Sequence, residues 1–101
     1  MLESAISPSL LKLLFELTGS MDVNSAIREL FKDAVEHRLE KINKEIENFE
    51  KKYGMKFSDF KEAWEKDAIL NKYSYEIEKD FWEWEGLISR KRKLEEALKW
   101  I

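Results

Sequence analysis

Apolar side chains recur along most of this chain with the spacing of amphipathic helices. The first such segment is rich in leucine. Ser7 and Pro8 precede it and are favourable as the N-cap and the first residue of a helix, and Gly19 is suited to end it. The sequence therefore predicts a short, strongly apolar helix over residues 8–18.

A second and much longer helix is predicted over residues 23–53. Asp22 or Asn24 is placed to cap its start, and Gly54 follows its last residue. Its second half shows heptad spacing, which predicts a continuous apolar seam along one face, formed by Val35, Leu39, Ile42, Ile46, Phe49 and Tyr53.

Two more helices complete an all-α prediction. Ser58 is placed to cap a short helix over residues 58–66, and a C-terminal helix rich in aromatic residues is predicted over residues 74–101. Residues 2–6 alternate weakly between apolar and polar side chains, so a short strand is the alternative there. We expect one domain, in which the long helix packs against the aromatic C-terminal helix and the two shorter helices flank them.

The length of the second helix suggests self-association. A helix over residues 23–53 would span roughly 46 Å, whereas a compact domain of this size is about 35 Å across. One chain then has too little material to cover the whole seam. We expect a homodimer in which five seam residues form the interface: Leu39, Ile42, Ile46, Phe49 and Tyr53.

Charge and composition exclude several classes of protein. The net charge is −3, with six Lys/Arg against ten Asp/Glu in residues 1–50 and twelve against eleven in residues 51–101. Neither half has the basic excess of a nucleic-acid binder, and the consecutive basic residues 90–93 would point in four directions around a helix. Binding of nucleic acid is therefore not favoured, although it is not excluded.

The chain contains no cysteine, which excludes disulfides and thiolate metal sites. It has no apolar run of membrane-spanning length and no signal peptide, so we expect a cytoplasmic protein that does not contact a membrane. Glu and Lys are abundant and Gln is absent. This bias is typical of thermophile proteins, and equally of any helical protein rich in Lys and Glu.

Candidate catalytic and metal-binding residues are few. His37 lies four residues after Asp33, but two ligands are too few for a metal site. All-helical nucleotide pyrophosphatases hold Mg²⁺ between acidic helical pairs, and this chain has three such pairs without the family's Glu-x-x-Asp half: Glu47 with Glu50, Glu62 with Glu65, and Asp80 with Glu83. We therefore predict no enzyme activity, no metal and no cofactor.

Residues 73–87 are the most distinctive stretch. Phe81 and Trp84 fit the inward face of the C-terminal helix, whereas Trp82 lies about 200° from Trp84. Trp and Tyr are enriched at binding hot spots, and acidic neighbours suit a basic partner protein. The candidate partner-binding residues are Tyr75, Asp80, Trp82, Glu83 and Trp100; packing of Trp82 inside the chain is the alternative.

Two resemblances bear on function. Residues 2–40, with a Pro-started helix, the Gly19 turn and a second helix opening in Ile27-Arg28, resemble a ribbon–helix–helix repressor. However, residues 2–6 contain no Lys, Arg, Asn or Gln to contact base edges. Residues 35–90, above all residues 49–60 and 75–85, are similar to small helical antitoxin-like proteins of prokaryotic toxin–antitoxin operons.

The second resemblance implies a protein that neutralises a toxin, such as a ribonuclease-type protein with a basic active site. It carries over no functional residues. We therefore expect a non-catalytic protein-binding module that acts as an antitoxin by occluding its partner. A DNA-binding repressor and a purely structural homodimer are the alternatives.

Overall fold

The computed structural model describes residues 6–101, and these form four helices and no strand. The helices are α1 (Pro8–Thr18), α2 (Val23–Tyr53), α3 (Phe57–Glu65) and α4 (Tyr75–Leu98). The predicted all-α class is confirmed, and α1 and α2 have the predicted bounds. The strand considered for residues 2–6 falls almost entirely outside the described residues.

Local capping signals fix the ends of α1 and α2. The Ser7 hydroxyl accepts a hydrogen bond from the Leu10 amide, and Asp22, rather than Asn24, caps α2 by accepting from the Ser25 amide. Gly19 and Gly54 end the two helices with φ values of 70° and 67°. This left-handed conformation strains other residues but not glycine, so these two positions stop the helices where the sequence predicts.

The bounds of α3 and α4 differ slightly from the prediction. α3 begins at Phe57, after Lys56, and its N-cap makes no side-chain hydrogen bond, so Ser58 is not the cap. Burial of Phe57 and Phe60 sets its start instead. Ser74 does cap α4, but the helix ends at Leu98 because the next two amides donate to carbonyls three residues back, which tightens the last turn.

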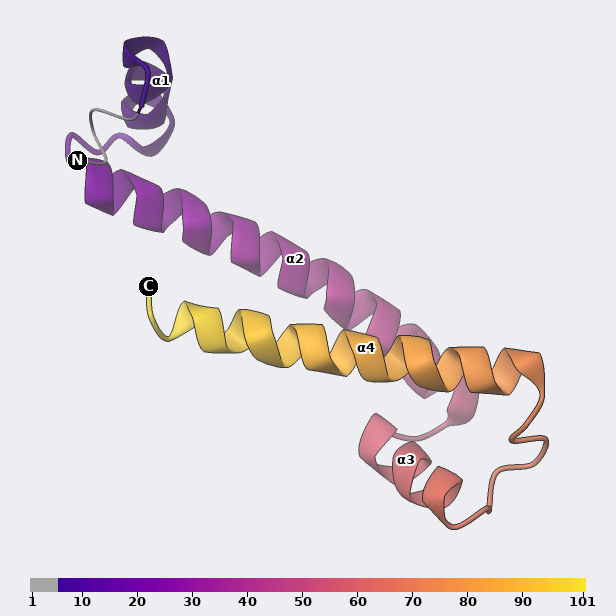
Figure 1. Cartoon of the computed structure of the whole chain (residues 1–101). Coiled ribbons are helices and arrows are strands. Elements are labelled where there is room, and N and C mark those ends of the chain that lie inside the picture. Colours follow the sequence, from indigo (N-terminus) through magenta and orange to yellow (C-terminus); the bar gives the residue numbers. More distant parts are fainter. Residues whose placement is uncertain (1–5) are drawn as a thin grey trace.

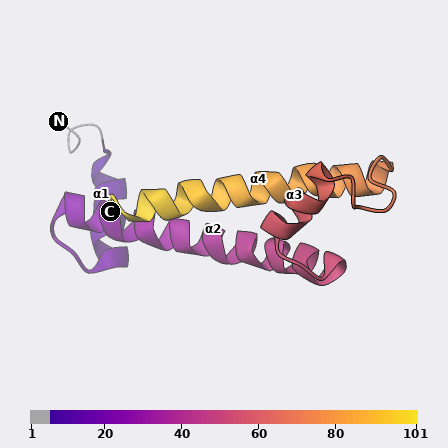
Figure 2. The ribbon, with the colours of Figure 1, turned by 90° about the horizontal axis from the view of Figure 1, so that it is seen from below.

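The helices form an elongated molecule with principal extents of 58 × 23 × 23 Å. Helix α4 runs back alongside α2 in the opposite direction, α3 lies at the end where the chain reverses, and α1 crosses the start of α2 (Figures 1 and 2). The radius of gyration is 19.8 Å, against about 13 Å for a compact domain of this length. The protein is therefore a rod built on a pair of helices.

The core of the rod has an aromatic end and an aliphatic middle. Trp84 is fully buried, and the rings of Phe49, Tyr53 and Phe60 lie with their centroids within 5.8 Å of its ring. Further along, Leu87 of α4 packs against α2. Close-packed rings of this kind hold α2, α3 and α4 rigidly together.

The seam of α2 is covered by α4 of the same chain. Ile42 and Ile46 are buried against Leu87, Phe49 and Tyr53 stack on Trp84, and Leu39 is half-buried. Four of the five residues that the sequence assigned to a dimer interface therefore already pack within one chain. The prediction assumed a compact globule, whereas a rod allows α4 to run back along α2 until Leu98 and Ile101 lie beside Arg28 and Lys32.

Candidate protein-binding face of helix α4

Asp80, predicted to face a partner, is turned into the protein. It is only 8% exposed, and its Oδ2 accepts hydrogen bonds of 2.5 Å from the Tyr53 hydroxyl and the Lys52 Nζ. Lys52 also donates to Glu76 at 2.8 Å. A buried carboxylate needs such partners. Asp80 therefore fastens α2 to α4 and is excluded from the binding surface.

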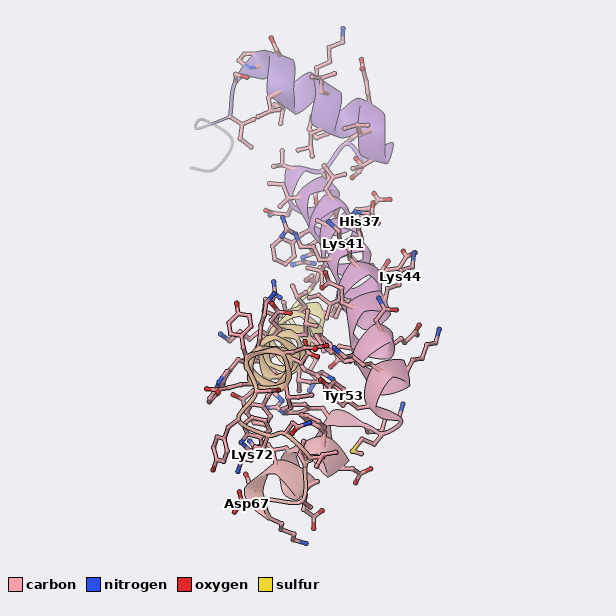
Figure 3. All side chains as sticks on the ribbon, turned by 90° about the vertical axis from the view of Figure 1, so that its right-hand side faces the viewer. His37, Lys41, Lys44, Tyr53, Asp67 and Lys72 are labelled. Carbon is pink, nitrogen blue, oxygen red and sulfur yellow. The ribbon has the colours of Figure 1, made fainter. Side chains whose placement is uncertain are left out.

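The ionisation of this cluster follows from its burial. Removal of the Tyr53 hydroxyl from water, together with its hydrogen bond to Asp80, raises the Tyr53 pKa to about 12. The hydrogen bonds to Asp80 and Glu76 raise the pKa of Lys52. At neutral pH Tyr53 is thus a neutral donor and Lys52 a cation, so the cluster acts structurally. Figure 3 shows Tyr53 at the end of α2 where α3 and α4 meet.

The outer face of α4 carries two exposed aromatic residues. Tyr75 is 81% exposed and Trp82 is 59% exposed, and their separation of two helical turns, roughly 10 Å, places them on one side of the helix. The Trp82 ring stands edge-on against Phe81, with ring centroids 5.1 Å apart. Both side chains are therefore exposed, and the alternative that Trp82 packs inside the chain is wrong.

Two grooves flank Trp82. The first groove lies between α4 and α2 and includes Glu45, Asn48 and Glu83. The second groove lies between α4 and α3 and includes Lys61 and Glu85, whose side chains form a 3.5 Å ion pair. Trp82 and Gly86 line both grooves. We call Trp82, Gly86 and these two grooves the Trp82 saddle.

Gly86 lines both grooves without a side chain that would enter them. It lies one turn after Trp82, in the middle of α4, and it does not have the positive φ that requires glycine. A Cβ atom placed on it would meet nothing within 4 Å, so tight packing does not require glycine either. Glycine within a helix costs about 1 kcal/mol relative to alanine. Neither the backbone nor the packing of the fold explains this cost.

Trp100 does not belong to the same surface. It is 83% exposed, but it follows the end of α4, eighteen residues and roughly 27 Å from Trp82 along the helix axis. The face between them carries Ser89, Lys93 and Glu96, which are polar and exposed. Of the five predicted partner-binding residues, the structure therefore brings together Tyr75, Trp82 and Glu83.

The connector before α4 adds two exposed residues that were not among the predicted partner-binding residues. Leu70 is 84% and Tyr73 is 80% exposed, beside the start of α4. The Nζ of Lys72 holds this connector by donating to the Trp64 carbonyl and to Asp67, at 2.7 Å each (Figure 3). Loop residues of this kind have no helical periodicity, so only their unusual apolar character could have identified them.

The remaining candidates are dispersed. His37 is exposed on α2, away from Tyr53 (Figure 3), and no group of three or more His, Asp or Glu side chains that could hold a metal exists within residues 6–101. The acids of the three pairs mostly contact nearby cations: Glu50 pairs with Lys56, and Glu62 with Lys66. Arg90 lines the groove beside α2 and Arg92 the one beside α3, so the basic cluster is split as predicted.

The chain is an all-α protein built on an antiparallel pair of helices, α2 and α4. Its α4 carries the exposed Trp82 saddle. Residues 8–101 match the model of a family described as the uncharacterized protein MJ0235 family, and the chain belongs to this family. No curated protein and no solved structure matches it. Within the described residues, no helix has the length and apolar character needed to cross a membrane.

Proposed function

We propose that this protein is a non-catalytic binding module, and that it works as an antitoxin by covering the functional surface of a partner protein with the outer face of α4. The observation that carries the proposal is the Trp82 saddle. Trp82 is an exposed ring on a rigid helix, and the neighbouring glycine leaves room beside it that the fold does not use.

The rigidity of α4 supports this role. Trp82 follows directly on the buried Phe81, and its own ring contacts that residue, so its position is set by the aromatic core. A preorganised aromatic side chain loses little conformational entropy on binding, which is why such residues dominate many interfaces. Side chains of a partner that combine an apolar stem with a polar end would fill the grooves on either side of Trp82.

The charges on the first half of α4, before and around Trp82, favour a basic partner. In residues 75–85 four acidic side chains, Glu76, Glu78, Glu83 and Glu85, lie outside the core, against a single Lys79. Asp80 adds nothing here, because it is buried against Lys52. This acidic half of α4 would accelerate encounter with a basic protein, while Lys61, Arg90 and Arg92 balance the acidic side chains in the grooves themselves. A toxin with a basic active site fits this description.

The experiment is co-expression with the product of the neighbouring gene, followed by purification through a tag on that product. The wild-type chain should copurify, and Trp82→Ala should weaken the complex by at least roughly thirtyfold, the loss typical of a hot-spot residue. Trp100→Ala is the matched control, since Trp100 is exposed but lies far from the saddle. Equal affinities of Trp82→Ala and wild type would remove the saddle from the proposal, and absence of a complex would remove the antitoxin role.

A further inference from the structure

Helix α1 is apolar on more sides than residues 6–101 cover. Leu11, Leu14 and Phe15 are half-buried where α1 contacts α2, and no residue of α1 is fully buried. A second stripe, formed by Leu10, Leu13 and Leu17, is 53–74% exposed. These positions follow the i, i+3, i+7 spacing of one helix face, so the leucines form a continuous apolar stripe.

The exposed apolar area at this end is a large part of what an interface needs. Met21 follows the stripe and Phe31 lies further along α2, and both are more than half exposed. Full burial of one such side chain removes roughly 60–120 Å² of apolar surface from water. Weighted by their exposed fractions, the three stripe leucines together with Met21 and Phe31 therefore still expose roughly 200–400 Å² of apolar surface. One side of a standard interface of about 800 Å² contains about 450 Å² of apolar surface. The α1 end supplies much of that amount.

The charges at this end are nearly balanced. Residues 8–38 contain four Lys/Arg and five Asp/Glu, in contrast to the acidic first half of α4. Lys12 pairs with Glu16 at 3.9 Å, as does Lys32 with Glu36. A balanced surface neither attracts a strongly charged partner nor repels a copy of itself.

We propose that the stripe of Leu10, Leu13 and Leu17 binds the same stripe of a second copy of this chain. A permanently exposed leucine stripe needs a partner that is always present, and a second copy is synthesised together with it. A two-fold dimer brings identical patches together, which an uncharged stripe of leucines permits. This dimer leaves the Trp82 saddle free and does not depend on its function.

A lipid surface is the competing occupant. Helices that lie on membranes carry several Lys or Arg residues on their polar face. The charged residues of α1, in contrast, are Lys12 and Glu16. The net charge of α1 is therefore zero, and anionic lipid would not attract it. The composition of α1 thus favours protein over lipid.

The test is the mass of the full chain in solution, measured by sedimentation equilibrium at micromolar concentrations. We expect a dimer in the wild type. Leu13→Lys/Leu17→Lys should raise the dimer dissociation constant by at least roughly a hundredfold, because burial of each leucine accounts for one to two powers of ten. Leu70→Lys is the control: it is equally exposed but lies at the other end of the rod, and it should remain dimeric.

Three outcomes would overturn the proposal. The first is a monomeric wild type. The second is a dimer whose affinity Leu13→Lys/Leu17→Lys leaves unchanged while far-UV circular dichroism shows intact helices, which would place the interface elsewhere. The third is a wild-type monomer that sediments with phosphatidylcholine–phosphatidylglycerol vesicles, which would assign the stripe to lipid.

Discussion

Replacement of Gly86 by alanine separates the demands of the fold from those of binding. The new Cβ meets nothing within 4 Å, and the backbone of residue 86 is not in the left-handed region, so the substitution introduces neither a clash nor strain. Removal of glycine from a helix interior then stabilises the protein by about 0.8–1.0 kcal/mol. For a domain of about 100 residues, this corresponds to a rise in Tm of roughly 4–8 °C.

The assay is urea denaturation of wild type and Gly86→Ala, followed by circular dichroism. The midpoint should rise while the slope with denaturant stays the same, because the surface exposed on unfolding hardly changes. A loss of stability would refute the reasoning, since it would mean that Gly86 is required by packing. Gly86→Leu extends the test, because its side chain would lean over the preceding turn toward Trp82, fill the saddle and weaken partner binding.

Three further predictions concern the core. Tyr53→Phe should reduce the loss of stability at high pH: the Tyr53 pKa is raised from 10 to about 12 by folding, so its stabilising contribution is complete below pH 10 and disappears as the pH rises toward 12. Denaturation midpoints across this range, with the exposed Tyr75→Phe as control, test this, and equal pH profiles of Tyr53→Phe and wild type would contradict it. Trp84→Ala should lower the free energy of unfolding by about 3–5 kcal/mol because it leaves a cavity at the centre of the ring cluster. Trp84→Phe should lose much less, since it keeps a ring and removes an Nε1–H that has no hydrogen-bond partner within residues 6–101; equal losses in urea denaturation would show that ring packing is not the dominant contribution. Asp80→Ala should destabilise the protein by about 1–3 kcal/mol, because Tyr53 loses its acceptor in a half-buried site, and unchanged thermal stability would show that the cluster does not fasten α2 to α4.

The sequence was sufficient where structure is decided locally. Ser7, Asp22 and the two glycines that end α1 and α2 act through contacts with residues three or four positions away, so the bounds of both helices could be predicted. The start of α3 could not, because the burial of Phe57 against other helices decides it. Likewise, α4 was predicted in the correct region. Whether it covers the seam of α2, however, depends on the conformation of the connector between α3 and α4, which the sequence pattern does not determine.

The candidate site, too, could be predicted where local periodicity decides and not where contacts between helices decide. The 200° separation of Trp82 from Trp84 along the helix indicated that the two rings lie on different sides, but it left open whether Trp82 is exposed; the structure shows it 59% exposed, with Trp84 fully buried. Asp80 lies four residues before Trp84, so the same periodicity could have indicated its inward direction. Its partner Tyr53, however, belongs to another helix. Gly86 was visible as a glycine inside a predicted helix, but only the empty space around it shows that packing does not require it.

The central claim, that a partner covers the outer face of α4, is tested most directly by the accessibility of Trp82 to acrylamide. The measurement uses fluorescence quenching in a Trp100→Phe background, which leaves Trp82 as the most exposed tryptophan, with the chain free and in complex with the neighbouring gene product. We predict strong quenching in the free chain and a large decrease in the complex. Equal quenching in the free and bound states would contradict the claim.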